Sequence, residues 1–489
     1  MEGITKGRKR SSLLTQKQQL QQRRSFLRCT TRSLVCFLAL IVNAYLVILF
    51  SLINSKESSE RTTIKSEIIR RKDSSSQNDD DDDDDEKNKM VAIGKANNNN
   101  NDYGRGSDEN IITIGVASTV TQCGSDPFID GAAVLKYSLD IHSAKNNNNK
   151  KNSKFKSKYI YDNIILYHPN ATECVLPLKN LGFILLERPT PINIDEIQGD
   201  GGLRERIGVT GCCGEKELIK LESFRLTQYP IVIHLDLDVI ISNPMDDVLD
   251  FMLNPKRFKE SPELLAKIPI MWPNKTDKII PDDISLLFTK DYNVVAPKRS
   301  DKPFQGGFFM IKPNLDTYNE FINIVRSGDY DIKKGWGNKV GPFHGGMTIQ
   351  GLFPWFYEYL HPGTSVELNR CIYNNMSDKP FLERDNKMKI CRTNEKVCED
   401  CRYKNMTDVA TFHFTICQKP WKCLSYKSQN PDFRLCREMN HLWYTYRSQL
   451  EVSWGRTGKG IGNLNPKHYM GYCNEGAYLP IEAPYGKAN

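Results

Sequence analysis

Residues 54–110 contain few apolar side chains. The segment has instead an unbroken aspartate run, Asp79–Asp85, and an asparagine run, Asn97–Asn101. Such a composition cannot bury enough apolar surface to offset the entropy lost on folding, so a packed core is excluded here. We predict a disordered, low-complexity stem, with metal binding by the aspartate run as a second interpretation.

Residues 34–53 lack any charged side chain. The run LVCFLALIVNAYLVILFSLI has the length, about 20 residues, that a helix needs to cross a bilayer. A cleaved signal peptide is the alternative, but the residues after Ile53 lack an A-x-A type of cleavage pattern. We therefore predict an uncleaved transmembrane signal anchor, Leu34–Ile53.

The net charge of +8 does not indicate a nucleic-acid partner, because much of it is concentrated before this anchor. By the positive-inside rule, residues 1–33 form a cytosolic tail and everything from Asn54 onward is lumenal. The predicted topology is type II, and we expect no nucleic-acid partner. The basic residues of the tail are Lys6, Arg8, Lys9, Arg10, Lys17, Arg23, Arg24, Arg28 and Arg32.

Twelve of the 14 cysteines lie beyond the anchor, and the C-terminal part, residues 371–489, is rich in them. In an oxidising lumen this density predicts disulfides, whose connectivity the sequence does not give. Sequons agree with a lumenal, glycosylated domain. They begin at Asn170, Asn274, Asn375 and Asn405.

Four of these cysteines also allow a zinc site. Cys398 and Cys401 form one C-x-x-C pair, with Cys391 and Cys417 nearby, but the sequence lacks a second C-x-x-C to complete the usual pattern. A zinc-stabilised structural ectodomain stays open as an alternative.

A folded lumenal domain is predicted over residues 111–489. Residues 111–119 form a short apolar, β-branched run, residues 128–142 carry apolar side chains at helical spacing, and a second strand starts at Asn163. Alternation of strands and helices predicts an α/β fold with a mostly parallel central sheet flanked by helices.

The most informative segment follows this alternation. Residues 215–228 have apolar side chains at three-residue intervals and predict a helix, and residues 231–235 predict a buried strand that ends in Asp236 and Asp238. Open α/β sheets bind ligands at the carboxyl ends of their strands. Alternate residues of a strand point the same way, so both carboxylates are expected to reach one cation.

Two carboxylates at such a place suit a hard, oxygen-preferring cation, Mn²⁺ or Mg²⁺. The cation would hold the two phosphates of a nucleotide diphosphate and offset charge as the leaving group departs. The alternative is that Asp236 and Asp238 cap the next element.

Three segments resemble the glycogenin-like family 8 glycosyltransferases, of the nucleotide-diphospho-sugar transferase superfamily. They are Lys220–Phe251, with the Asp-x-Asp motif; Phe304–Phe321, with a glycine-centred strand; and His413–Trp421, HFTICQKPW. The resemblance covers about Ile111 to Trp421. It implies a GT-A-type, Rossmann-like domain that uses Mn²⁺ (or Mg²⁺) and a UDP-sugar donor.

By resemblance, Asp236, Asp238 and His413 bind Mn²⁺, and Lys419 contacts the diphosphate. Lys220 faces the donor sugar or its phosphate. The loop around Ser118 touches the nucleotide base.

The chain departs from the family pattern in two places. Gln305 stands where the family has asparagine, and still offers an amide. Ile349 stands where the family has an aspartate proposed to assist transfer, and His344 is a nearby polar candidate. We take Lys220, Gln305 and His344 as catalytic candidates and expect retention of anomeric configuration, which a front-face reaction achieves without a dedicated nucleophile.

The predicted protein is a Golgi membrane enzyme that transfers a sugar to a glycan or glycoprotein, with the endoplasmic reticulum as the second location. Because Ile349 replaces the aspartate, a catalytically inactive, lectin-like lumenal domain is the alternative.

Overall fold

The computed structural model describes residues 111–124, 127–144, 157–273, 279–296, 299–383, 389–393, 395–423, 430–456 and 468–482. The predicted cytosolic tail, anchor and stem lie outside these residues. Among the described helices, none is long and apolar enough to cross a bilayer.

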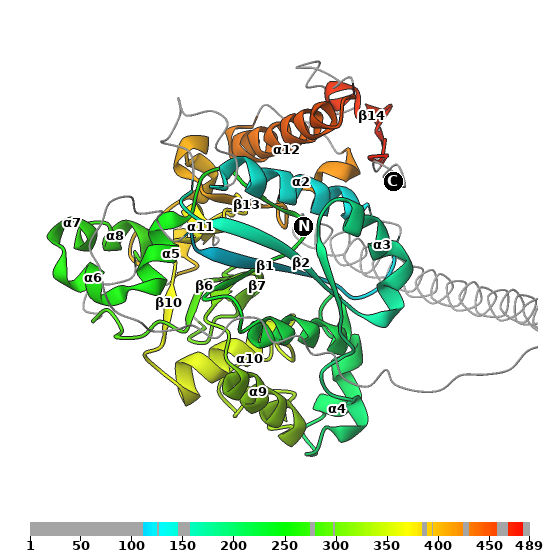
Figure 1. The fold of residues 1–489 in the computed structure, drawn as a ribbon. Coiled ribbons are helices and arrows are strands. Elements are labelled where there is room, and N and C mark those ends of the chain that lie inside the picture. The colour runs from blue at the N-terminus through cyan, green and yellow to red at the C-terminus, as the bar shows by residue number, and fades with distance from the viewer. Residues whose placement is uncertain are drawn as a thin grey trace, which may run out of the picture. The chain divides into compact units, whose positions relative to one another are not determined.

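A seven-stranded sheet forms the centre of the described domain (Figure 1). In spatial order its strands are β10 (Ser365–Glu367), β6 (Leu286–Lys290), β7 (Phe304–Ile311), β4 (Val232–Leu235), β1 (Thr113–Val120), β2 (Ile160–Tyr167) and β3 (Ile184–Glu187). β4, β1, β2 and β3 run parallel, as do β10 and β6, and β7 is antiparallel to both of its neighbours. The predicted mixed α/β fold with a mostly parallel sheet is confirmed.

Helices cover both faces of this sheet. The α-helices are α2 (Phe128–His142), α3 (Thr172–Asn180), α4 (Leu203–Arg206), α5 (Asp246–Leu253), α6 (Pro255–Glu260), α7 (Pro262–Leu265), α8 (Ile268–Met271), α9 (Leu315–Ser327), α10 (Ile349–Trp355), α11 (Arg370–Tyr373) and α12 (Arg434–Ser453). Figure 1 shows α2 between the sheet and α12, with α9 and α10 on the opposite side.

The side chains of β4 show why helices cover both faces of the sheet. Ile231, Ile233 and Leu235 belong to the apolar cluster on the α2 side, whereas Val232 belongs to the cluster on the α9 side. Successive side chains of a strand point to opposite faces, so a continuous apolar run is typical of a strand buried between two layers.

Short two-stranded pairs flank the main sheet. They are β5 (Val239–Ile241) with β13 (Thr411–His413), β8 (Tyr330–Asp331) with β9 (Gly335–Trp336), β11 (Phe381–Glu383) with β12 (Lys389–Cys391), and β14 (Cys473–Asn474) with β15 (Ala477–Tyr478).

The helix predicted over residues 215–228 is a 3₁₀-helix, η5 (Gly214–Arg225). Leu218, Leu221 and Phe224 are buried along it. A 3₁₀-helix has three residues per turn, so side chains at three-residue intervals lie in one line along it. The spacing therefore suits the observed helix better than the predicted one.

Ten described cysteines form five disulfides. The pairs are Cys123–Cys174, Cys371–Cys401, Cys391–Cys398, Cys417–Cys436 and Cys423–Cys473. The alternative zinc site is wrong, because all four of its cysteines are in disulfides and have no thiolate to offer a metal.

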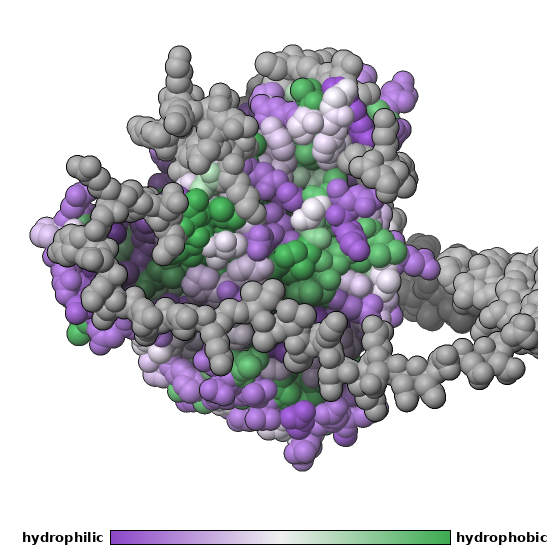
Figure 2. All heavy atoms as spheres, in the orientation of Figure 1, coloured by the Kyte–Doolittle hydropathy of each residue, from purple (hydrophilic) through white to green (hydrophobic). Residues whose placement is uncertain are grey.

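Hydrophobic residues on the face seen in Figure 2 lie in patches among hydrophilic ones. The large apolar side chains that are exposed, such as Val209 and Ile279, are spread along the chain.

Candidate metal centre and active site

Asp236 and Asp238 lie at the carboxyl end of β4, in the tight turn that leads into β5. The backbone N–H of Val239 donates to the carbonyl oxygen of Asp236 at 3.2 Å, which closes the turn. The two carboxylates therefore converge through a turn and not, as expected, through the alternation of an extended strand.

β5 brings a third ligand to these carboxylates. It pairs with β13 in antiparallel register, with His413 opposite Val239, and the N–H of Phe414 donates to the carbonyl oxygen of Asp238 at 2.9 Å. One ligand atom from each of Asp236, Asp238 and His413 lies within 4.8 Å of the others. Residues far apart in the sequence thus form one cluster because the apolar run after the Asp-x-Asp motif needs a strand partner.

The imidazole of His413 has a fixed orientation. Its Nδ1 lies 3.1 Å from the amide oxygen of Asn374, whose amide nitrogen donates to Thr289 at 2.8 Å. An amide oxygen only accepts, so Nδ1 carries the proton and Nε2 faces Asp238 Oδ1 at 3.4 Å. Nε2 and the Asp238 carboxylate therefore converge as two possible ligands of one cation.

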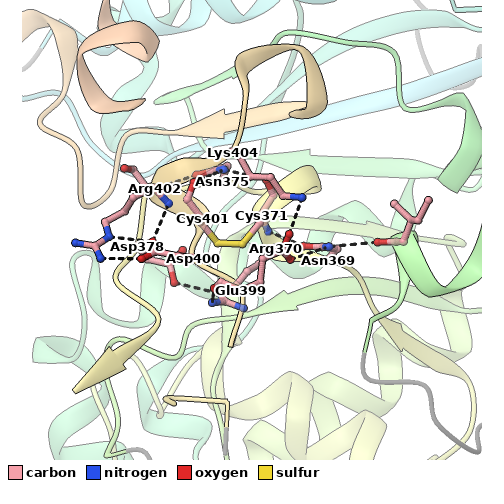
Figure 3. Close-up of a disulfide and its surroundings, with 12 residues drawn as sticks. Asn369, Arg370, Cys371, Asn375, Asp378, Glu399, Asp400, Cys401, Arg402 and Lys404 are labelled. Carbon is pink, nitrogen blue, oxygen red and sulfur yellow. Dashed lines mark hydrogen bonds and ion pairs between the residues drawn. A yellow bond between two sulfur atoms is a disulfide. The ribbon is translucent and has the colours of Figure 1, made fainter. Parts of the chain in front are cut away.

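A disulfide is linked to β13 through Asn375, and Figure 3 shows this disulfide with its surroundings. Cys371, in α11, is bonded to Cys401, and the side-chain amide of Asn375 donates to both cysteine carbonyls, at 2.8 and 3.3 Å. The backbone N–H of Asn375 donates to Thr411, and the N–H of His413 donates to Asn375, each at 3.0 Å. The disulfide therefore fixes the segment that holds β13 and His413.

The cluster of Asp236, Asp238 and His413 can form because residue 307 is a glycine. Gly307 lies on β7, next to β4, and its carbonyl oxygen accepts from the N–H of Asp236 at 3.0 Å. A Cβ atom at this position would lie 2.3 Å from Asp236 Oδ2 and 2.7 Å from His413 Cε1. Both distances are shorter than a packed structure tolerates, so no larger residue fits.

Two lysines pair with the carboxylates. The ammonium of Lys419 contacts Asp238, and Nζ of Lys220 lies 3.0 Å from Asp236 Oδ1 and donates to the carbonyl oxygen of Gly306 at 2.8 Å. Burial alone would raise the pKa of Asp238, but His413 and Lys419 outweigh it and hold the pKa well below the usual range. Two anions and two ammonium groups therefore meet at one end of the sheet.

Lys220 is buried and stays charged. Burial would lower its pKa, but the carboxylates of Asp236 and Glu217 raise it above the ordinary value. The sequence analysis included Lys220 and Asp236 but overlooked Glu217.

Glu217 lies one turn of η5 before Lys220, with its carboxylate Oε1 3.5 Å from Nζ. Its other oxygen accepts from the hydroxyl of Thr348 at 2.6 Å. A Cβ on Gly306 would lie 3.3 Å from Oε1, so this carboxylate borders the same strand as the metal cluster. In the sequence, the three-residue spacing between Glu217 and Lys220 was the feature that could have indicated Glu217.

The structure places the other predicted residues as follows. Gln305 is buried at the start of β7, and its amide oxygen accepts from the N–H of Gly307 at 2.5 Å. Ser118 is buried in β1, and His344 is exposed before α10. Within the described residues, no hydrogen bond or ion pair joins Ser118 or His344 to the cluster. The roles of all these residues stay predictions.

Ile349 lies in the apolar cluster on the α9 side and is fully buried. Its side chain is therefore part of the apolar core. Among the described residues, the polar contact from this segment to the candidate site is made by its neighbour Thr348, whose hydroxyl donates to Glu217.

No protein-family model matches this chain, and no curated protein matches it. Several solved structures are similar over parts of it. The apo form of mouse xyloside xylosyltransferase 1 is 11% identical, over 54% of this chain and 87% of that one, with a TM-score of 0.31. The galactosyltransferase LgtC, in complex with donor and acceptor sugar analogues, is 11% identical over 68% of this chain and 95% of that one, with a TM-score of 0.32. The glycosyltransferase GlyE of Streptococcus pneumoniae TIGR4 is 11% identical over 71% of this chain and 64% of that one, also with a TM-score of 0.32. At TM-scores this low the similarity does not decide the function.

Proposed function

We propose that this chain is a metal-dependent glycosyltransferase that takes its sugar from a UDP-sugar. The observation that carries the proposal is the convergence of Asp236, Asp238 and His413 within 4.8 Å at the end of β4. Carboxylate and imidazole ligands fit Mn²⁺, with Mg²⁺ as the second choice. The finer assignment, a GT-A-type enzyme like those of family 8, depends on the three sequence motifs.

Some residues of the site would bind the metal ion, and others would compensate the charge of the diphosphate. A metal ion at Asp236, Asp238 and His413 would offset the charge of the diphosphate leaving group. The ammonium groups of Lys419 and Lys220 lie against two of these ligands, so both are placed to meet phosphate oxygens. Such preformed positive charge stabilises a departing group because it needs no reorganisation during the reaction.

Glu217 places a carboxylate beside Lys220 and Gly306. Ile349, at the position of the family's aspartate, has no carboxylate to offer. We assign Glu217 the role of holding the Lys220 ammonium toward the donor. With this support the reaction proceeds with retention through front-face attack, and an NMR spectrum of the first product would show the retained anomer.

Glu217→Gln is expected to lower kcat by roughly 10²-fold, because the amide still accepts from Thr348 but no longer holds the charge of Lys220. The measurement is UDP release at saturating donor. Glu222→Gln is the matched control, since Glu222 is a buried, ion-paired carboxylate of the same helix that contacts Arg188 and Arg225. Equal kcat values for Glu217→Gln and the wild type would exclude this role.

The proposal is tested with the full-length chain in detergent. UDP release is measured over a panel of UDP-sugars with Mn²⁺, with Mg²⁺ and with a chelator, with and without glycan and glycoprotein acceptors. Metal-dependent release from one donor supports a transferase. Mn²⁺-dependent UDP binding without release from any donor favours the alternative, a lectin-like or inactive binding domain. Absence of both overturns the proposed site.

We also propose that the domain is lumenal, in a type II Golgi membrane protein anchored by Leu34–Ile53, with the endoplasmic reticulum as the second choice. Five disulfides in the described residues agree with an oxidising compartment.

Lumenal residence predicts a pattern of N-glycosylation. Asn170 and Asn405 are exposed, so both are expected to carry glycans when the chain is expressed in eukaryotic secretory cells. Asn375 is expected to carry none, because its amide is buried against the carbonyls of Cys371 and Cys401. Asn274 lies outside the described residues.

The pattern is measured by glycosidase-sensitive gel shifts of Asn170→Gln and Asn405→Gln, each of which should remove one glycan. Glycopeptide mass spectrometry reports on Asn375 directly. A chain without any glycan, or a glycan on Asn375, would count against the lumenal placement or the fold of this segment respectively.

A further inference from the structure

Cys212 and Cys213 are the described cysteines that belong to none of the five disulfides. Their Sγ atoms are 2.6 Å apart. Ordinary non-bonded contacts between carbon atoms lie at about 3.5–4.0 Å, and sulfur is larger than carbon. The two sulfur atoms are therefore much closer than unrelated thiols would be.

The backbone around the pair is a fixed turn. Gly211 and Gly214, on either side of the cysteines, both have φ of +61°, a conformation that glycine adopts without strain. A Cβ on Gly214 would lie 2.4 Å from the carbonyl oxygen of Gly208. Glycine at both positions thus permits the turn, and the two cysteines lie between these glycines with their sulfur atoms in contact.

This turn lies beside Glu217 and Lys220, the part of the candidate site that we assign to the donor and call the donor side. A Cβ on Gly211 would be 3.5 Å from Glu217 Oε2 and 3.7 Å from the Cα atom of Gly345. The thiol of Cys213 is hydrogen-bonded to Thr121, just beyond the end of β1. The pair therefore connects the end of β1 with the Glu217–Lys220 end of η5.

We propose that Cys212 and Cys213 form a sixth disulfide, between neighbouring residues, and that it is a redox-sensitive part of the donor side. Its formation does not depend on the proposed function, whereas its effect on donor binding does.

The reaction that forms it is thiol–disulfide exchange with a protein or small-molecule disulfide of an oxidising compartment. The Cys213 thiolate attacks one sulfur of that disulfide, and the first thiol leaves. Cys212 then attacks Cys213 in the mixed disulfide, and the second thiol leaves. The cysteine pair is oxidised, the partner disulfide is reduced, and the two thiol protons end on the released thiols.

The environment favours Cys213 as the attacking group. A hydrogen bond from Cys212 lowers the pKa of the Cys213 thiol to about 7, against the opposite effect of burial. A thiol whose pKa is close to the ambient pH is well suited to exchange.

Neighbouring Cα atoms are about 3.8 Å apart, less than the roughly 4.4–6.8 Å that a disulfide usually spans. A bond between Cys212 and Cys213 is therefore constrained, and constrained or exposed disulfides are reduced first. Its opening would release the turn that backs onto Glu217.

Mass spectrometry tests the disulfide directly. The full-length chain is purified without reductant, alkylated and digested with trypsin, which gives one peptide, residues 207–216, with both cysteines and no other. We expect this peptide to be unalkylated and lighter than the dithiol by two hydrogen atoms. A peptide alkylated on both cysteines, or either cysteine joined to a different one, would overturn the proposal.

A titration with mild reductant tests the sensitivity. The Cys212–Cys213 peptide is expected to become alkylated before the peptides of the other five disulfides, and the KM for the UDP-sugar to rise about 5- to 10-fold in parallel. Cys212→Ser/Cys213→Ser should have a KM that mild reductant does not change. A wild-type KM unchanged after reduction of this pair overturns the regulatory part. Absence of turnover in both redox states counts against the proposed function, while the mass of the peptide still decides whether the disulfide forms.

Discussion

Asp238→Asn is expected to abolish metal-dependent UDP release, with a fall of at least about 10³-fold. Asp238 is the one residue of the cluster that contacts both the imidazole of His413 and the ammonium of Lys419. The substitution keeps the shape of the side chain but removes the negative charge that binds the metal ion. Because Asn presents a neutral oxygen, His413 and Asp236 alone would hold the ion weakly.

This loss is expected without unfolding. Lys419 is partly exposed, so its ammonium stays hydrated when its partner is neutral, and the melting temperature should change by only a few degrees, on the order of 1 kcal/mol. Mn²⁺ binding by electron paramagnetic resonance and thermal unfolding are measured beside UDP release. Asp316→Asn, at the exposed start of α9, makes the same charge change away from the site. Wild-type Mn²⁺ affinity in Asp238→Asn would refute the metal assignment.

The sequence predicted the strands and helices around this site because their apolar patterns are local. β1, α2 and β4 bury side chains at spacings that single segments display, whereas β7 was expected only from the resemblance of its glycine-centred segment. At η5 the three-residue spacing predicted a helix without its type. It suits a 3₁₀-helix, in which each N–H bonds to the carbonyl three residues earlier instead of four. The local pattern did not show that Asp236 and Asp238 lie in a turn, which depends on the pairing of β5 with β13.

Asp236, Asp238, His413, Lys419 and Lys220 were selected together only through resemblance, and the structure brings these five into contact. The residues that support them were missed. Asn374 and Asn375 position His413 through contacts between segments, and Asn375 had been seen only as the start of a sequon. Glu217 is functional in our proposal because its carboxylate lies beside the Lys220 ammonium, and its contact with Thr348, from another segment, holds it there. Such roles depend on tertiary neighbours, and disulfide partners do as well.

Gly307→Ala is expected to weaken Mn²⁺ binding and UDP release by at least about 10²-fold, although it replaces none of the three ligand residues. The added methyl group would lie 2.3 Å from Asp236 Oδ2 and 2.7 Å from His413 Cε1, so at least one ligand must move. β7 is buried between β4 and β6 and cannot easily shift. Overpacking of this kind also destabilises a protein, by about 1–3 kcal/mol.

Gly306→Ala is the matched control, one residue earlier on the same strand. Its methyl group would lie 3.3–3.8 Å from Glu217 Oε1, Gln350 Cγ and Lys220 Nζ, each farther than the 2.3 and 2.7 Å contacts at Gly307. Its Mn²⁺ affinity is therefore expected to stay within about 0.5 kcal/mol of the wild type, about twofold. Calorimetric titration with Mn²⁺ at a temperature where both variants are folded compares them directly. If both alanines weakened binding equally, destabilisation of β7 would explain the result. If only Gly307→Ala does, the metal ion binds where Asp236 and His413 meet.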